Sequence, residues 1–249
     1  MSDEKPSELF RGQEFLGRWV GLSIFAGMTA RSAMQMPGEG EPTLAFVRWG
    51  LIVTLFALFT LAYLRRPKAR ALASRPVEIA LPLVVGGLPM LQDGPPSTFL
   101  RRVAENPEWA PLLRSVFQPL LSVPEIPALA LMAAGEAFAV VAMFWLGRSF
   151  SLFVEVRELA SGGPYRLVRH PVYFGELIAI WGYALLWSSA WSLGMAALIT
   201  ALQAWRARVE ERKLLEHIPE YAAFRERTGF LWPRLSSLWS SGATASSAD

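Results

Sequence analysis

Long apolar runs separated by charged stretches dominate the chain. Runs of about 17–25 apolar residues are expected to cross a bilayer as helices, because lipid offers the backbone no hydrogen-bond partners. The third of six such stretches is short and is interrupted by prolines and glycines, so it is either a kinked span or a re-entrant segment. The pattern predicts an all-α, polytopic membrane bundle of about six spans, with five possible. The stretches are Leu16–Met34, Leu44–Leu64, Val77–Gln92, Ile126–Gly147, Val172–Ser189 and Trp191–Trp205.

Basic residues in the short loops indicate the orientation, because they accumulate on the cytoplasmic side. The loop before the second span holds Glu39 and Glu41 and no base, and the tail from Arg206 onward is rich in Arg. Six spans with both termini cytoplasmic satisfy these biases, whereas five would move the N-terminus across. We expect a multi-pass integral protein of the inner or plasma membrane if the source is bacterial. The loop after the second span carries Arg65, Arg66, Lys68, Arg70 and Arg75 before any acid.

Three regions are expected along the chain. Residues 1–125 hold the N-terminal spans and a Pro-rich connection, whose part Phe99–Phe117 is expected to lie at the interface. Residues 126–235 form a core in which a very short turn makes the last two spans an antiparallel hairpin, followed by a cytoplasmic helical extension that breaks at Pro219. Residues 236–249 are small and polar and are predicted to be disordered.

Composition narrows the classes of function. Hydrophobic residues make up 53% and charged residues 18%, against about 25% charged in soluble domains. The chain has no Cys and only two His, which excludes disulfides and thiolate chemistry and argues against a zinc site. The net charge of +3 is too small to indicate nucleic acid. We therefore expect membrane lipids and a small amphipathic molecule as partners, without a metal or nucleic acid.

The segment from Gly162 to Glu176 carries the most distinctive chemistry. A loop rich in Gly and Pro leads directly into a predicted span, where free backbone N–H groups and the helix dipole favour negative charge. Aromatic rings, His170 and two Arg side chains gather there. They could hold a ligand with a carboxylate, a flat base and a positive centre. An ordinary juxtamembrane loop, basic because it is cytoplasmic, is the open alternative.

A second cluster begins where the hairpin returns to the cytoplasm, so it should lie close to that loop. Adjacent acids on a helix point about 100° apart, so at most one of Glu210 and Glu211 is expected to face the same ligand. A solvated helix with ordinary charge pairs is the alternative. The cluster consists of Arg206, Arg208, Glu210, Glu211, Leu214 and Tyr221.

The chain resembles the isoprenylcysteine carboxyl methyltransferase family and the related phospholipid N-methyltransferases. The elements that carry the resemblance are Gly163-Pro164-Tyr165, the run Arg169–Tyr173, the hairpin, the twin glutamates Glu210 and Glu211, and Tyr221. The resemblance covers about Leu146 to Pro233. It implies an enzyme that uses S-adenosylmethionine, bound at the cytoplasmic face. Arg157 stands where eukaryotic members carry a His. By position, the residues implied to bind the cofactor are Leu159, Ala160, Tyr165, His170, Pro171, Val172, Tyr173, Glu210 and Glu211.

The resemblance also implies a lipidic or amphipathic acceptor. It places Arg206 near a substrate carboxylate, with Glu211 as a second catalytic candidate and Glu176 on the substrate side. A carboxylate is already ionised and needs only an Arg to orient it, whereas an amine must first lose a proton to a base. Arg206 therefore favours a carboxylate acceptor, while Glu176 and the twin glutamates keep phospholipid N-methylation open. A sterol-reductase-like enzyme using NADPH and a non-enzymatic membrane protein are the alternatives of other classes.

Two acids and two glycines within the predicted spans carry further expectations. A charge at the membrane centre costs about 2.5–3.5 kcal/mol on insertion scales, so Glu136 and Glu176 should face the bundle interior. Glu176 follows the matched motif and is expected at the site, whereas Glu136 is either functional or a partner for an interior donor. Gly182 and Gly194 are expected to let the two hairpin helices approach closely.

Overall fold

The computed structural model describes residues 8–91 and 108–234, and these parts are helical apart from turns and three isolated bridge pairs. This confirms the all-α expectation for the described residues. The predicted tail 236–249 lies outside them, and so do residues 99–107 of the segment Phe99–Phe117 that is expected at the interface. The elements are α1 (Glu8–Met34), α2 (Thr43–Arg65), α3 (Pro76–Gly87), η1 (Leu88–Leu91), α5 (Ala110–Phe117), α6 (Glu125–Leu146), η2 (Gly147–Ser149), η3 (Gly163–Arg166), α7 (Pro171–Trp187), α8 (Ala190–His217) and α9 (Tyr221–Arg227).

The six apolar stretches correspond to α1, α2, α3 with η1, α6, α7 and α8. Local sequence explains several boundaries. Pro76 and Pro171 occupy the first turns of α3 and α7, where the missing N–H of proline costs nothing. The chain breaks between α8 and α9 around Pro219, as predicted. The helical extension expected after the last apolar stretch continues α8 without interruption to His217.

Two of the described helices are long and apolar enough to cross a bilayer by length and composition, namely residues 43–65 and 125–149, each with a mean hydropathy of 2.0. In the most apolar window of α2 only 11% of the residues are buried, and the large apolar side chains of Val47, Leu61 and Leu64 are exposed. Such an exposed apolar surface is uncommon on a soluble monomer and suits lipid. The apolar helices therefore indicate a membrane protein, while the six-span count and its orientation stay predictions.

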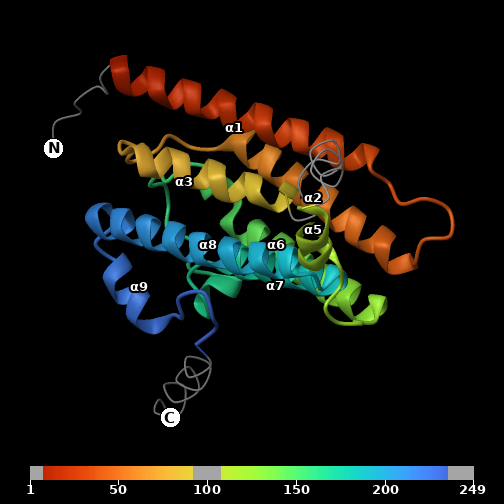
Figure 1. Cartoon of the computed structure of the whole chain (residues 1–249). Coiled ribbons are helices and arrows are strands. Elements are labelled where there is room, and N and C mark those ends of the chain that lie inside the picture. Colours follow the sequence, from red (N-terminus) through yellow and green to blue (C-terminus); the bar gives the residue numbers. More distant parts are fainter. Residues whose placement is uncertain (1–7, 92–107, 235–249) are drawn as a thin grey trace, which may run out of the picture.

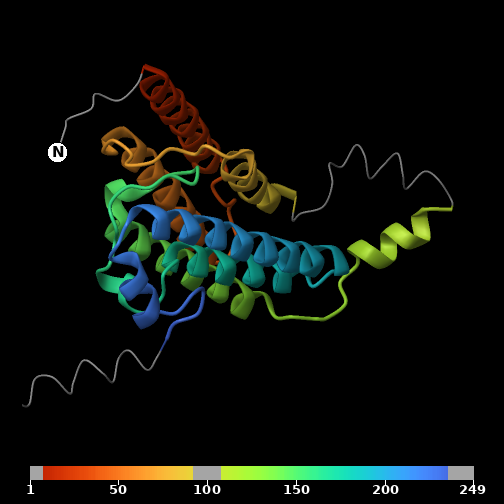
Figure 2. The ribbon, with the colours of Figure 1, turned by 90° about the vertical axis from the view of Figure 1, so that its left-hand side faces the viewer.

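The hairpin turn between α7 and α8 is as short as expected. Ser188 ends α7 in the left-handed conformation with φ of 46°, and Ser189 caps α8 by accepting a hydrogen bond from the Ser192 N–H at 3.1 Å. Figure 2 places this turn near α5, at the end of the bundle opposite the loop after α6 and α9. The latter end is the predicted cytoplasmic one.

Glycines bring α6 and α7, not α7 and α8, into close contact. A Cβ on Gly175 would lie 2.6 Å from the Gly135 carbonyl oxygen, and one on Gly182 would meet Met132 of α6 at 2.7 Å. Gly194 has open space around it. The expectation that Gly182 and Gly194 draw the hairpin helices together is therefore wrong. The small residues of α7 predicted a close approach to another helix, but not that this helix is α6.

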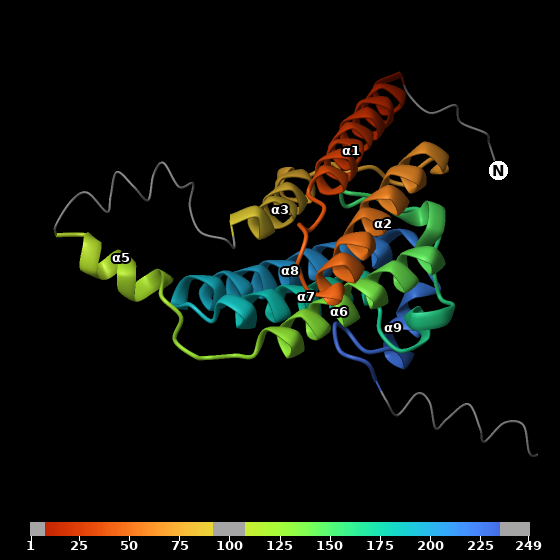
Figure 3. The ribbon, with the colours of Figure 1, turned by 90° about the vertical axis from the view of Figure 1, so that its right-hand side faces the viewer.

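The first three helices lie along one side of the α6–α8 group (Figures 1 and 3). An aromatic cluster of Phe25, Phe59, Tyr63 and Phe150 joins α1 and α2 to the chain that follows α6. The rings of Phe59 and Phe150 stack with centroids 4.3 Å apart. Gly21 makes room for Tyr63, because a Cβ there would lie 2.1 Å from the tyrosine ring. The N-terminal helices are thus packed against the predicted cytoplasmic end of the core.

Glu136 has a partner that the sequence did not reveal. Arg48 of α2 places its Nε 3.6 Å from Glu136 Oε1 of α6, and the glutamate side chain is 10% exposed. Neither Arg48 Nε nor Glu136 Oε2 has a hydrogen-bond partner in the described parts of the chain. Of the two open interpretations, the structure supports that of Glu136 as a partner for an interior donor.

Glu136→Leu is expected to lower the free energy of unfolding by about 3 kcal/mol, because it leaves Arg48 without a counter-charge in an apolar surrounding. The double variant Arg48→Leu/Glu136→Leu should recover much of the loss. Reversible unfolding in mild detergent measures both, with exposed Glu125→Gln at the start of α6 as the control. Equal losses in the single and double variants would show that the two side chains are not coupled.

Candidate functional site

The Gly-Pro loop lies against the end of α6. Gly163 has φ of +52°, in the left-handed region that favours glycine. A Cβ on Gly163 would approach the Trp145 ring to 2.4 Å, and one on Gly162 to 2.7 Å. The loop then turns through η3, where Tyr165 is buried. The two glycines thus allow the close approach that seats Tyr165.

Gly163→Ala is expected to lower the free energy of unfolding by about 1–2 kcal/mol from the left-handed backbone alone, with the contact to Trp145 adding to the loss. The double variant Gly163→Ala/Trp145→Ala should remove the steric part and keep the backbone part. Thermal unfolding in detergent measures both. Gly194→Ala, where space is open, serves as the control and should leave the midpoint unchanged or slightly higher.

The start of α7 is held by the end of the described chain. We call residues 228–234 the C-terminal strap. The Arg169 N–H donates to the Gly229 carbonyl at 2.8 Å, and the Gly229 N–H donates to the Leu167 carbonyl at 3.0 Å. Phe230 of the strap packs edge-on against the His170 ring, with centroids 5.7 Å apart. The strap therefore orients the His-Pro segment that opens α7.

Arg169 and Glu211 form a buried ion pair beneath the strap. Arg169 Nε lies 2.5 Å from Glu211 Oε1, and its NH1 donates to the carbonyls of Arg225 at 2.9 Å and Thr228 at 2.5 Å. Burial acts to raise the pKa of Glu211. The hydrogen bonds and charges of His170 and Arg169 outweigh it, so the pKa of this carboxyl is lower than usual. Glu211, on the extension of α8 beyond the predicted span, is therefore ionised.

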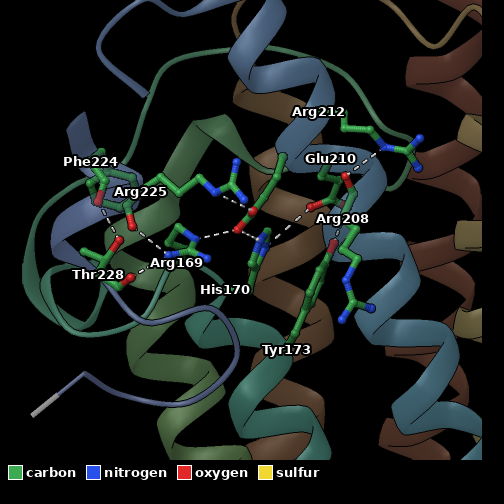
Figure 4. Close-up of polar contacts among 10 residues, drawn as sticks. Arg169, His170, Tyr173, Arg208, Glu210, Arg212, Phe224, Arg225 and Thr228 are labelled. Carbon is green, nitrogen blue, oxygen red and sulfur yellow. Dashed lines mark hydrogen bonds and ion pairs between the residues drawn. The ribbon is translucent and has the colours of Figure 1, made fainter. Parts of the chain in front are cut away.

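Glu210 occupies the other side of His170 (Figure 4). The Tyr173 hydroxyl and Arg206 Nε both donate to Glu210 Oε1, the latter at 3.1 Å. The His170 Nδ1 lies 3.8 Å from Glu210 Oε2, while its Nε2 lies 3.3 Å from Glu211. The His170 and Tyr173 rings stack with centroids 5.4 Å apart. The hairpin thus brings the loop and the twin glutamates together, as the spacing predicted.

A cavity of about 130 Å³ opens beside these groups. Its walls come from the chain after α6, the loop before α7, the extension of α8 and α9. Of the twin glutamates only Glu210 lines it, which agrees with the expectation that one acid faces the ligand. The predicted cofactor residues on its wall are Leu159, Ala160, Tyr165, His170, Val172, Tyr173 and Glu210.

Four predicted site residues do not line the cavity. Pro171 is buried in the first turn of α7, and Glu211 is engaged by Arg169. Arg206 donates through NH2 to the Leu152 carbonyl at 2.9 Å and lies over the Tyr173 ring, 4.9 Å from its centroid. Glu176 lies one turn deeper, where Gln203 Nε2 donates to its Oε2 at 2.9 Å. Arg206 thus contacts two residues of the cavity lining, Tyr173 and Glu210, and Glu176 contacts Gln203, but neither Arg206 nor Glu176 lines the cavity.

The cavity has two chemically distinct ends. One is apolar and aromatic, with Tyr165, Tyr221 and Phe224 packed in a single cluster. Burial raises the pKa of both tyrosines, so their hydroxyls stay protonated. The buried Tyr221 hydroxyl has no hydrogen-bond partner among residues 8–91 and 108–234. The other end carries the charged groups around His170 and Glu210.

Sequence reasoning missed two parts of the wall. The segment from Ser149 to Glu158 supplies much of the lining, yet the sequence predicted no site residue within it. Lys213 also lines the cavity, and its Nζ lies 2.5 Å from Glu78 Oε2 at the start of α3. Glu78, an isolated acid at the third position of α3 just after a basic loop, is the feature of the sequence that could have indicated this ion pair.

Known proteins match part of this chain. Residues 125–220 match the family model of phospholipid methyltransferases. The cobalt-zinc-cadmium resistance protein CzcN of Cupriavidus metallidurans is 34% identical over 106 residues, which is 41% of this chain and 47% of that protein. The nickel-cobalt-cadmium resistance protein NccN of Alcaligenes xylosoxydans xylosoxydans is 31% identical over 106 residues, or 41% and 48%. The chain spans about half the length of these curated relatives.

The matched region 125–220 contains α6, η3, α7 and α8, and so includes both the Gly-Pro loop and the twin glutamates. It contains neither the first three helices nor the C-terminal strap. The match therefore indicates a methyltransferase-like membrane core, to which this chain adds segments on both sides.

Proposed function

We propose that this protein is an integral membrane methyltransferase that takes its methyl group from S-adenosylmethionine and transfers it to an amphipathic acceptor in the bilayer. The observation that carries the proposal is that His170, Tyr173 and Glu210 line one cavity. Tyr173 and Glu210 are 37 positions apart and are joined by a hydrogen bond. The family match over residues 125–220 supports the same chemistry.

The residues present fit this cofactor. S-adenosylmethionine combines a flat aromatic base with a carboxylate, an ammonium and a sulfonium. The aromatic end with Tyr165 and Tyr221 suits the base. Glu210, which lines the cavity, suits a positive centre. The cavity is smaller than the ~300–1,000 Å³ of most ligand sites, so binding requires wall side chains to move outward.

When bound, the cofactor supplies a methyl group that its sulfonium has already activated. The protein has to align the acceptor with that methyl group and to exclude water. Tyr173 and Arg206 fix the carboxylate of Glu210 in one orientation, because both donate to the same oxygen. The apolar wall around Val156 and Leu159 excludes water from the other end.

The geometry favours an amine acceptor over the carboxylate expected from the sequence. That expectation depended on Arg206, whose guanidinium is already bonded to Glu210 and to the Leu152 carbonyl. The Glu210 carboxylate lines the cavity and suits a cationic headgroup. Glu210 is then the base that takes the proton an ammonium must lose before its nitrogen can attack.

The two relatives are named for metal resistance, and we do not extend metal binding to this chain. Among the described residues, no group of three or more His, Cys, Asp or Glu side chains is placed to hold a metal ion. What each relative shares with this chain is a stretch of 106 residues, less than half of either protein.

Transfer of a radioactive methyl group tests the proposal. Membranes containing the protein are incubated with methyl-labelled S-adenosylmethionine, and the lipid extract is treated with mild alkali. We expect label that stays non-volatile after alkali, even where the acyl esters of the lipid are cleaved, since N-methyl groups are stable whereas methyl esters yield volatile methanol. Label recovered as volatile methanol would return the acceptor to a carboxylate. Absence of transfer together with tight binding of NADPH would replace the methyltransferase by a reductase.

A further inference from the structure

We infer that the first three helices complete the active site and that Tyr63 of α2 is a positioning residue for Arg206 and Glu210. The inference rests on the proposed function and names residues outside the matched region 125–220. Its basis is a set of contacts that join α1–α3 to the segment Ser149–Arg157, which forms one wall of the cavity. We call this segment the cavity wall.

The first contact runs from α2 to the charged end of the cavity. Tyr63 is fully buried, and its hydroxyl accepts a hydrogen bond from the Leu152 N–H at 2.7 Å. The carbonyl of the same Leu152 accepts from Arg206 NH2 at 2.9 Å. Arg206 in turn donates to the Glu210 carboxylate. Leu152 lies between lining residues of this segment without lining the cavity itself, and it connects the Tyr63 hydroxyl to the group proposed as the base.

A buried charge cluster fixes the same wall three residues further on. Glu155 Oε2 lies 2.7 Å from Arg157 NH2 and 3.4 Å from Arg66 NH1, and all three side chains are at most 3% exposed. Arg66 NH2 donates a hydrogen bond to the Glu14 carbonyl of α1 at 3.2 Å, and Arg157 NH1 donates to the Pro67 carbonyl. These contacts join the wall to α1, to α2 and to the chain that follows α2.

The third contact comes from α3 and the chain before it. The Val156 N–H donates to the Ala71 carbonyl at 2.9 Å, and the Val154 N–H donates to the Glu78 carbonyl at 3.1 Å. The Glu78 side chain holds Lys213, whose Nζ also donates to the Leu72 carbonyl at 2.5 Å. Lys213 lines the cavity, so α3 orients a side chain of the site as well as its wall.

Tyr63→Phe tests the inference, because it removes one oxygen and keeps the ring among Phe25, Phe59 and Phe150. Binding of S-adenosylhomocysteine to the purified full chain is measured by calorimetry well below the unfolding temperature. We expect the affinity to fall by about threefold to tenfold, as for the loss of one buried hydrogen bond. Tyr183→Phe on α7 is the matched control and should bind like the unaltered protein.

Hydrogen exchange separates positioning from a general loss of stability. In Tyr63→Phe the amides of residues 149–157 should exchange faster, while those in the middle of α6 keep their protection. Glu78→Gln provides a second variant and should weaken binding in the same direction. Unchanged affinity in both variants would overturn the inference and leave the proposed function intact. Failure of the unaltered protein to bind S-adenosylhomocysteine would overturn both.

Discussion

Glu210→Gln is expected to lower the rate of methyl transfer by about 10²–10⁴-fold, the range for removal of a general base. The glutamine keeps an acceptor for the Tyr173 hydroxyl and for Arg206, so the surrounding geometry should persist. It cannot take a proton from an ammonium acceptor. Initial rates of label incorporation into lipid, at saturating S-adenosylmethionine, measure the loss.

The pH dependence distinguishes a base from a binding group. Acceptor amines lose their proton in solution as the pH rises, so the deficit of Glu210→Gln should shrink at higher pH. The control is Glu216→Gln, an exposed acid on the same helix that lies 4.0 Å from Arg75. A deficit that is the same at every pH, with binding of S-adenosylhomocysteine lost in parallel, would make Glu210 a cofactor ligand and not the base.

Arg169→Met is expected to cost about 3–5 kcal/mol of stability, the range for removing one member of a buried ion pair. The substitution leaves Glu211 with fewer positive neighbours and frees the carbonyls of Arg225 and Thr228. The C-terminal strap should then detach from the start of α7. Thermal unfolding and proteolysis within residues 228–234 measure the two effects.

Arg166→Met, an exposed arginine of the same loop, is the control and should change neither measurement.

Lowering the pH should weaken the same ion pair, because it protonates Glu211. Because the folded-state pKa of Glu211 is lowered from 4.5, its contribution is present above that pH and is lost as the pH falls through the folded value. Stability should therefore fall more steeply below pH 4.5 in the unaltered protein than in Glu211→Gln. Parallel curves would mean that Glu211 is not the group responsible.

The parts of the site that could be predicted lie close together in sequence or are joined by one short turn. The run from Gly163 to Tyr173 carries its own turn and helix-start signals. The uncharged turn at Ser188-Ser189 forces the next helix back along α7. Together these two features bring the loop and the twin glutamates to one end of the bundle, without knowledge of any other helix.

The parts that could not be predicted depend on which helices are neighbours. The spacing of Arg206 and Glu210, four positions apart on one helix, could have indicated their pairing, whereas the contact of Arg206 with the Leu152 carbonyl could not be predicted. Gly182 was assigned to the hairpin, whereas it faces α6. The pairs Arg48–Glu136 and Glu78–Lys213 join segments far apart in sequence. Apolar periodicity identifies a helix but not the neighbour that its polar residues contact.

Photochemical cross-linking tests the central claim most directly, namely that the loop before α7 and the extension of α8 enclose one cofactor. Labelled S-adenosylmethionine is irradiated on the purified chain, and the modified peptides are mapped. We predict label on peptides with the cavity tyrosines Tyr165, Tyr173 or Tyr221, and its loss when S-adenosylhomocysteine competes. Competed label confined to peptides of α5, at the opposite end of the bundle, would contradict the account.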